Sequence, residues 1–268
     1  MTTRITILGC GSSGGVPRVG QGWGACDPAN PRNRRRRCSI LIESGDPAAP
    51  TTILVDTSPD VREQLLDAGV RWLDGVVMTH DHADHTHGLD DLRPLTMVMR
   101  QKIAVYADPA TEDSLLNRFA YCFVQPPGSG YPPILRLHRV AFGARLEVPG
   151  RAGAFVFDTF PLVHGDVTVL GLRFNNVAYT PDVSSIPLDS IPHLQGLDLW
   201  IIDALRPAPH PTHFSLSEAL MWIERMQPKR AILTNLHTDL DYATLMATLP
   251  EGVIAAHDGM VIPLGPDT

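Results

Sequence analysis

The sequence predicts an α/β protein in which helices cover β-sheets from outside. Short apolar segments of strand length recur from residue 4 to residue 264, and helical patterns lie between pairs of them. The chain has 268 residues, of which 44% are hydrophobic, so it can bury a sizeable core. Because no low-complexity linker divides it, we expect a single domain over residues 1–268.

The first half of the chain opens with strands. Residues 58–69 are expected to form a helix, with Ser58 as its N-cap, Pro59 in its first turn and Gly69 at its end. The other expected elements are paired strands at 38–43 and 51–56, further strands at 4–8, 74–80 and 103–107, and a helix at 109–121.

The second half contains more strands, and one helix has a clear start signal. Ser215 and Glu218 have the spacing of a capping box, so a helix is expected at 215–226. Strands are expected at 154–164, 168–174, 176–182, 197–203, 229–237 and 252–264, with one short helix between the last two.

The glycines after the first strand do not form a dinucleotide-binding motif. Gly9, Gly11 and Gly14 have the spacing GxGxxG, but that motif requires a helix to begin at the glycines. Pro17 and three further glycines follow at once and prevent a helix. We expect a glycine-rich turn at the rim of a site.

Composition excludes several functional classes. The net charge of −7 argues against a nucleic-acid partner. The absence of an 18-residue apolar run argues against a membrane span, and the N-terminus does not resemble a signal peptide. The four cysteines have irregular spacing, so we expect a reducing, cytoplasmic setting.

Residues 79–88, THDHADHTHG, hold the densest group of metal-ligand side chains in the chain. His80 and His82 are two residues apart at a strand end and project to the same side if the backbone is extended. Asp84 and His85 follow, where we expect the chain to turn into a helix. Imidazole and carboxylate groups together favour zinc, iron or manganese.

Ligand-type residues also end three later strands. His164, Asp182 and His237 each follow an apolar segment. Because the cluster at 79–88 cannot by itself complete a site that also admits substrate, these three residues are the candidates to complete it.

These motifs resemble the metallo-β-lactamase superfamily, within it the branch of PhnP-like phosphoribosyl cyclic phosphodiesterases and tRNA 3′-processing nucleases. The resemblance rests on segments 9–17, 79–85, 180–182, 213–219 and 258–260. It implies an αββα four-layer sandwich with two divalent ions, zinc or manganese. One ion would bind His80, His82 and His164, the other Asp84, His85 and His237, and Asp182 would bridge them.

The resemblance also implies roles for other residues. His213 would protonate the leaving group, and a hydroxide bridging the metals would attack phosphorus. Asp84 would take part in catalysis together with His213. Asp56 would orient a ligand histidine, and Asp258 would lie close to the ligands.

The sequence departs from the family at two places. The segment that carries a cysteine-rich structural zinc site in PhnP-like proteins has only Cys26 here, which argues against that zinc. The last ligand histidine often directly follows a threonine, but Thr234 is followed by Asn235. Because Asn235 and His237 are in phase on an extended segment, we expect both to face the site, with His237 as ligand.

Arg35 and Arg36 belong to the one basic run of the chain and are candidate phosphate-binding residues, although such runs are often solvated. The expected function is hydrolysis of a small, cyclic or alkyl, phosphodiester. Hydrolysis of a carboxylic ester or thioester, and a non-catalytic metal-carrier role, remain alternatives. The sequence does not decide the substrate, the metal or whether the chain forms a homodimer.

Overall fold

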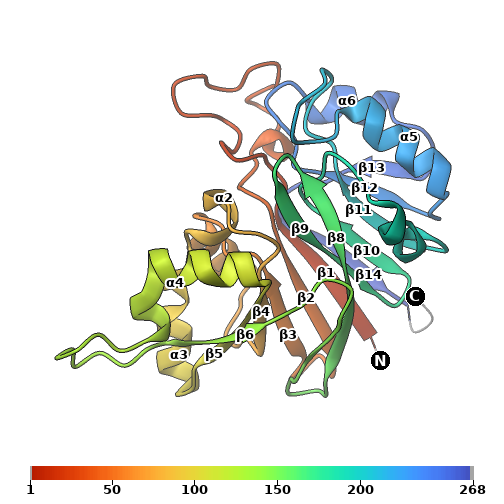
Figure 1. The fold of residues 1–268 in the computed structure, drawn as a ribbon. Coiled ribbons are helices and arrows are strands. Elements are labelled where there is room, and N and C mark those ends of the chain that lie inside the picture. Colours follow the sequence, from red (N-terminus) through yellow and green to blue (C-terminus); the bar gives the residue numbers. More distant parts are fainter. Residues whose placement is uncertain (1, 266–268) are drawn as a thin grey trace.

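The computed structural model describes residues 2–265, whose strands form two seven-stranded sheets (Figure 1). The first sheet has the order β14-β1-β2-β3-β4-β5-β6, formed by Met260–Leu264, Thr2–Gly9, Ser39–Gly45, Thr51–Val55, Gly75–Val77, Ile103–Ala107 and Leu135–Arg139. The second has the order β13-β12-β11-β10-β9-β8-β7, formed by Val253–Ala255, Ala231–Thr234, Leu199–Asp203, Val177–Thr180, Val167–Phe174, Phe155–His164 and Arg145–Val148.

The sheets bury side chains on both faces. In β1, Ile7 packs between the two sheets in one cluster with Tyr179 and Ile201 of the second sheet. Its neighbour Leu8 points the other way and packs in a cluster with Leu115 of α4 (Pro109–Phe123). This alternation follows from the two-residue period of a strand, and it explains why the strands appear as nearly continuous apolar runs.

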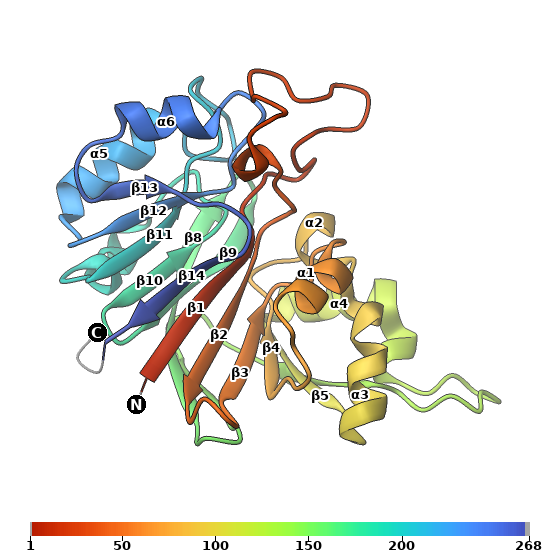
Figure 2. The same ribbon diagram turned by 180° about the vertical axis from the view of Figure 1, so that it is seen from behind.

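Helices cover the outer face of each sheet. The first is covered by α1 (Val61–Asp67), α3 (Arg93–Met99) and α4, and the second by α5 (Leu216–Met226) and α6 (Tyr242–Thr248), as Figure 2 shows. Shorter helical segments are α2 (Ala83–Thr86), η1 (Pro31–Asn33), η2 (Leu89–Leu92) and η3 (Leu188–Leu194). The predicted αββα sandwich is confirmed.

Most predicted elements are present, with differences at their ends. The capping box of Ser215 and Glu218 is present at the start of α5. The predicted N-cap of α1 was wrong, because the helix begins at Val61 after Asp60. The Ser58 hydroxyl instead accepts a hydrogen bond from the Asp60 amide, which forms a turn ahead of the helix.

The strand arrangement brings several strand ends to one edge. Strands β3, β4, β5 and β6 run parallel, as do β10, β11, β12 and β13. The carboxyl ends of neighbouring parallel strands lie at the same sheet edge, where α/β proteins place their binding sites. No helix within residues 2–265 has the length and apolar character needed to cross a lipid bilayer.

Candidate metal centre

The histidine cluster lies where β4 ends. His80 follows this strand by three residues, and α2 then reverses the chain so that His85 returns to the side of His80, with ring centroids 4.3 Å apart. The backbone around His85 is fixed, because its carbonyl accepts from Thr57 N–H and Thr57 in turn accepts from Gly88 N–H. A β-carbon at Gly88 would lie 2.1 Å from the Ser58 carbonyl oxygen, so this close approach requires glycine.

One group of candidate ligands combines both sheets. His80, His82, His164 and Asp182 each offer one ligand atom, and these atoms all lie within 4.8 Å of one another. Nδ1 of His82 lies 3.2 Å from Nε2 of His164, and that Nε2 lies 3.6 Å from Oδ2 of Asp182. His164 ends β8 and Asp182 follows β10, as expected for ligands at strand ends.

A second group shares Asp182 with the first. It consists of Asp84, His85 and Asp182. Nε2 of His85 lies 3.5 Å from Oδ2 of Asp84 and 3.4 Å from Oδ1 of Asp182. Asp182 therefore presents one carboxylate oxygen to each group, the arrangement that a bridging carboxylate needs.

The residues of both groups fit divalent metal ions. Nε2 of His80 and Nε2 of His85 are buried and have no hydrogen-bond partner within the described residues. Such atoms are rare in proteins because leaving them unpaired costs free energy, which a coordinated ion would recover. Burial, followed by the charge of His85, holds the pKa of His80 well below its usual range, so its imidazole is neutral as metal ligation requires.

Asp56 orients His85, as its predicted role requires. Its Oδ2 lies 2.7 Å from Nδ1 of His85, and Oδ1 accepts the Thr79 amide at 2.7 Å. Asp56 is fully buried and has a φ of 64°, a left-handed conformation that Asp tolerates better than most residues. Because Asp56 fixes Nδ1 of His85, Nε2 is directed towards the second group, where it would bind an ion.

His213 lies beside the first group, paired with Asp203. Its Nδ1 is 2.9 Å from Oδ2 of Asp203, and its ring centroid is 4.4 Å from that of His164. Burial alone would lower the pKa of His213, but the hydrogen bond and charge of Asp203 outweigh it and raise the pKa to about 9. Sequence reasoning missed Asp203, although it ends an apolar strand, β11, in the same way as the predicted ligands.

The structure does not bring His237 to the cluster, which corrects its expected position. Its Nε2 lies 2.7 Å from Nη1 of Arg18, and its Nδ1 lies 3.1 Å from the Asp239 carboxylate. Asn235 faces the cluster instead, with its amide nitrogen 3.2 Å from Oδ1 of Asp182 and 3.1 Å from Nδ1 of His213. The expected phase required an extended backbone, but Asn235 has a φ of 62°, which turns the chain.

The candidate phosphate-binding arginines are bound to other groups of the protein. Arg35 is 2% exposed, and its guanidinium donates to the carbonyl oxygens of His237 and Leu240. Arg36 forms ion pairs with Asp67 and Asp258. These contacts correct the expectation that Arg35 and Arg36 hold substrate: they fix loops around the site.

Asp258 also has a role other than the expected one. Besides pairing with Arg36, its carboxylate accepts the backbone amides of Cys10 and Arg36. These hydrogen bonds tie the turn between β13 and β14 to the loops after β1 and before β2. Within residues 2–265, Asp258 makes no hydrogen bond to a ligand histidine.

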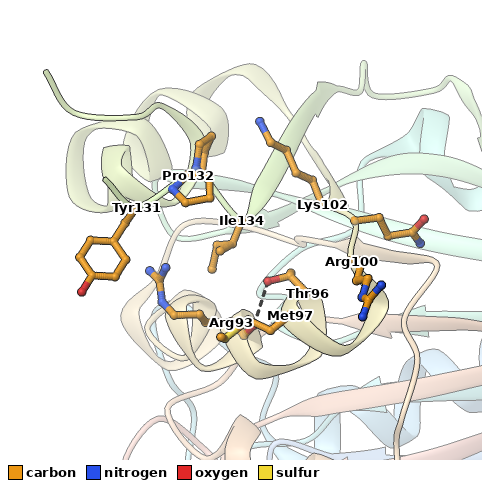
Figure 3. Close-up of a pocket in the computed structure, with 10 residues that line it drawn as sticks. Arg93, Thr96, Met97, Arg100, Lys102, Tyr131, Pro132 and Ile134 are labelled. Atoms are coloured by element: carbon orange, nitrogen blue, oxygen red, sulfur yellow. Dashed lines mark hydrogen bonds between the residues drawn. The ribbon is translucent and has the colours of Figure 1, made fainter. Parts of the chain in front are cut away.

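A separate hollow of about 480 Å³ lies between α3 and the segment before β6 (Figure 3). Met97, Tyr131 and Ile134 supply apolar surface, and Arg93, Arg100 and Lys102 are basic residues at its wall. It shares no residue with the two ligand groups and contains no histidine or carboxylate, so it does not form part of the metal centre.

Comparison with known families agrees with this geometry. The model of the beta-lactamase superfamily domain matches residues 51–235, more than half of the chain. The chain belongs to the metallo-β-lactamase superfamily. Its αββα sandwich and its strand-end histidines and aspartates are those of a metallo-β-lactamase hydrolase fold with a candidate metal site.

Individual relatives refine the placement within the metallo-β-lactamase superfamily. A crystal structure of a diphosphatase from the PhnP family has a TM-score of 0.88 and 36% identity, and the match covers 98% of each chain. An octanoyltransferase of Porphyromonas gingivalis is 33% identical over 96% of this chain and 51% of its own length. A ribonuclease Z of Bradyrhizobium diazoefficiens is 33% identical over 55% of this chain and 47% of its own length.

These matches confirm the predicted likeness to the PhnP-like and tRNA 3′-processing branch. The match covers about half the length of each of the two curated relatives named above. The name of a longer relative therefore does not by itself transfer an activity to this chain.

Proposed function

We propose that this chain is a metal-dependent hydrolase of small phosphodiesters, including cyclic ones. The observation that carries the proposal is the meeting of two ligand groups at Asp182, with the His213–Asp203 pair directly beside them. A hydrolase at phosphorus needs an activated water, stabilisation of the developing negative charge and a proton for the leaving oxygen. The residues present can support all three.

Two divalent ions, zinc or manganese, would be held by this chain's own side chains. The first would bind His80, His82, His164 and Asp182, and the second Asp84, His85 and Asp182. When bound, such ions supply a water that ionises near neutral pH and a clamp for phosphoryl oxygens. Asp56 keeps His85 in the required orientation through its hydrogen bond to Nδ1.

His213 is the residue that would protonate the leaving oxygen. Its Nδ1–H donates to Asp203, which leaves Nε2 to exchange the catalytic proton. The pKa of about 9 keeps this imidazole protonated near neutral pH, as a general acid must be. The side chain is 14% exposed, whereas Asp203 is fully buried, so His213 lies between the interior and solvent.

The relatives favour chemistry at phosphorus over an ester or thioester reaction. The diphosphatase matches over nearly the whole of both chains, and the ribonuclease name also denotes cleavage of a phosphodiester. The octanoyltransferase name denotes acyl transfer, but this chain matches only 51% of that protein, and it matches only 47% of the ribonuclease. The preference therefore rests on the diphosphatase, which matches over 98% of each chain.

The proposal is tested by comparing substrates on metal-loaded protein. We expect turnover of bis(p-nitrophenyl) phosphate and at least tenfold slower turnover of a matched thioester; about tenfold corresponds to 1.4 kcal/mol of barrier. His213→Gln should reduce kcat by about 10²-fold or more on a phosphodiester whose leaving group is an alkoxide, as expected for loss of a general acid. It should reduce kcat much less on bis(p-nitrophenyl) phosphate, because p-nitrophenolate leaves without a proton. Preference for the thioester, or no turnover of any phosphodiester with either metal, would contradict the proposal.

A further inference from the structure

Helix α4 contacts the loop that carries the first two ligand histidines. Asp81 lies between His80 and His82 in the sequence, and it belongs to neither ligand group. Its carboxylate instead binds two side chains of α4: Oδ2 accepts from the Ser114 hydroxyl at 2.7 Å and from Nη2 of Arg118 at 3.1 Å. One acidic residue of the histidine cluster therefore binds a helix of the outer layer.

Arg118 also binds the main chain of this loop. Its Nη1 donates to the Asp81 carbonyl oxygen, while Nη2 of the same guanidinium donates to the Asp81 carboxylate. The other partner of that carbonyl, the Thr86 hydroxyl, lies farther away at 3.5 Å. Because a guanidinium is planar and rigid, binding both groups of one residue restrains its backbone and its side chain together.

The loop depends on such contacts because its own main chain supplies few. Within residues 2–265, the amides of residues 80–82 donate to no main-chain carbonyl. His80 is fully buried, and its Nδ1 lies 3.0 Å from the Thr79 hydroxyl. His82 is only partly buried, unlike the other members of the first ligand group. It is therefore the ligand of that group whose position depends most on the loop.

The shape of α4 suits contact with this loop. Ser114 and Arg118 are four residues apart, so they lie on one face of the helix. Phe119 would point about 100° away from Arg118 in a regular helix. Its φ of −129° and ψ of 31° are not helical, and its ring centroid lies 5.6 Å from that of His87. The kinked helix thus contacts the segment after β4 at both Asp81 and His87.

The polar contacts of α4 are separable from its packing. The side chains of Asp81 and Arg118 are 27% and 43% exposed, and ion pairs this open to solvent add little to global stability. Helix α4 is held on the sheet by apolar residues such as Leu115, which packs in a buried cluster with Leu89 and Leu92. Removing the polar contacts should therefore loosen the loop without unfolding the protein.

We propose that Ser114 and Arg118 act through Asp81 as positioning residues of the first ligand group. Their hydrogen bonds hold His80 and His82 in the conformation that binds an ion. The inference rests on the metal dependence of the proposed function and adds two residues of α4 that touch no ligand atom. Without them the loop would occupy other conformations, and the apparent metal affinity would fall with the fraction of binding-competent protein.

The test measures Zn²⁺ binding to metal-free protein by competition with a chromophoric chelator. Ser114→Ala and Arg118→Gln should each raise the Kd of the tighter-bound ion by about tenfold, the lower end of the range for changes around metal ligands. The matched controls are Asn117→Ala, at an exposed position of α4, and Arg71→Gln, at an exposed position of the loop before β4. Both should keep the wild-type Kd, and urea unfolding should give similar stability for all metal-free proteins.

Two further measurements separate positioning from a general effect on structure. If Ser114 acts through Asp81, adding Ser114→Ala to Asp81→Ala should not raise the Kd further, because the two changes remove one interaction. The visible absorption of bound Co²⁺ depends on the geometry of its ligands. It should therefore change in Ser114→Ala and remain that of wild type in Asn117→Ala.

A wild-type Kd in both Ser114→Ala and Arg118→Gln would overturn the inference and leave the proposed hydrolase intact. Equal losses in the control variants, or effects of Ser114→Ala and Asp81→Ala that multiply, would also overturn it. Zn²⁺ binding that depends on the two residues, in a protein that hydrolyses no phosphodiester, would support the positioning role and contradict the enzyme. Wild-type protein that binds no Zn²⁺ would contradict both.

Discussion

At the residue scale, Asn235 lies beside the second ligand group and bears on how tightly that group would bind an ion. The first group offers three imidazoles and a carboxylate, whereas the second offers one imidazole and two carboxylates. The Asn235 amide nitrogen lies 3.2 Å from Oδ1 of Asp182, the carboxylate oxygen that faces His85 of the second group. Because an amide is a weaker ligand than imidazole for zinc, we infer that the second ion binds less tightly than the first.

The expected difference in affinity between the two ions predicts the effect of Asn235→His. Imidazole at this position should lower the Kd of the second ion by about tenfold or more, the scale of effects on metal affinity from changes around a site. The measurement is titration of metal-free protein with Zn²⁺, with bound metal counted by elemental analysis. Asn235→Ala, which adds no ligand, is the control, and equal second-ion affinity in all three proteins would contradict the inference.

The His213–Asp203 pair predicts a titration. In metal-free protein the imidazole resonances of His213 should titrate near its pKa of about 9, which the Asp203 carboxylate raises. Asp203→Asn removes that charge, so the midpoint should move to lower pH. Because a general acid must be protonated, activity should fall as pH rises through the pKa of His213, and in the variant it should fall at a lower pH.

NMR of ¹³C-labelled histidine measures the midpoint, and the pH profile of kcat measures the consequence. A midpoint unchanged by Asp203→Asn would show that Asp203 does not control His213. Glu147→Gln, a change of equal charge on the exposed face of β7, serves as the control.

Sequence reasoning located the cluster because its ligand types are adjacent and follow buried strands. It misplaced His237 because it assumed an extended backbone, which the left-handed Asn235 interrupts. It also could not distinguish a phosphate-binding arginine from Arg35, whose guanidinium satisfies buried carbonyl oxygens of a loop distant in sequence. Both features depend on tertiary contacts that residue type does not encode.

At the element scale, Asp241 joins helix α6 to the loop that precedes β2. As N-cap of α6 it accepts the Thr244 amide at 2.9 Å, and its other oxygen accepts from Asn33 at 2.6 Å and from the Asp27 amide at 3.1 Å. Burial opposes ionisation, but these hydrogen bonds outweigh it and hold the pKa of Asp241 below its usual range. The contacts support the loop in which Arg35 binds the His237 segment.

Asp241→Ala should therefore lower the free energy of unfolding at pH 7 by about 1–2 kcal/mol, the range for loss of an N-cap. A carboxylate with a depressed folded-state pKa stabilises above its unfolded pKa of about 3.9, and this contribution is lost as pH falls through the folded value. The difference from wild type should thus shrink below about pH 4.

Urea unfolding at pH 7 and pH 3 would measure this difference. Asp158→Ala, a change at an exposed position of β8, is the matched control and should alter stability much less. A loss of stability that is independent of pH, or equal in the control, would contradict the assigned role of the Asp241 carboxylate.

Strand and helix patterns predicted the buried elements better than the edge strands and the partly exposed helix α3. Edge strands β6 and β7 were not predicted, because LRLHR and RLEV mix charged and apolar residues over only a few positions. Helix α3 was also missed: its exposed Met97 and Val98 obscure the apolar face expected of an amphipathic helix. The central strands, buried on both faces, have the continuous apolar runs that identify them.

At the scale of the whole molecule, the candidate centre spans the two sheets. His80 and His85 follow a strand of the first sheet, whereas His164 and Asp182 come from the second. The Leu170 amide of β9 donates to the Thr79 carbonyl at 2.9 Å and holds the two halves together beside the ligands. The single domain over residues 1–268 stays a prediction, which the core shared by both sheets supports.

The fold was predictable because the hydrophobic pattern of the sequence indicates sheets covered by helices. The resemblance to the metallo-β-lactamase superfamily then implied the αββα order of the layers. The contact of Arg18 with His237 was not predictable, because the two residues lie 219 positions apart in the sequence. Backbone hydrogen bonds between the loop after β1 and the segment after β12 bring them together. Contacts between loops are for this reason harder to predict than ligands at strand ends.

The most direct test of the account is the metal dependence of phosphodiester hydrolysis. Chelated and dialysed protein should not hydrolyse bis(p-nitrophenyl) phosphate, and added Mn²⁺ or Zn²⁺ should restore turnover. The same recovery is expected in the control variant Arg71→Gln, a change at an exposed position of the loop before β4. His80→Ala should stay inactive, since it removes a buried ligand of the first group. Turnover by metal-free protein, or full activity in His80→Ala, would contradict the assignment of this cluster as the metal centre of a hydrolase.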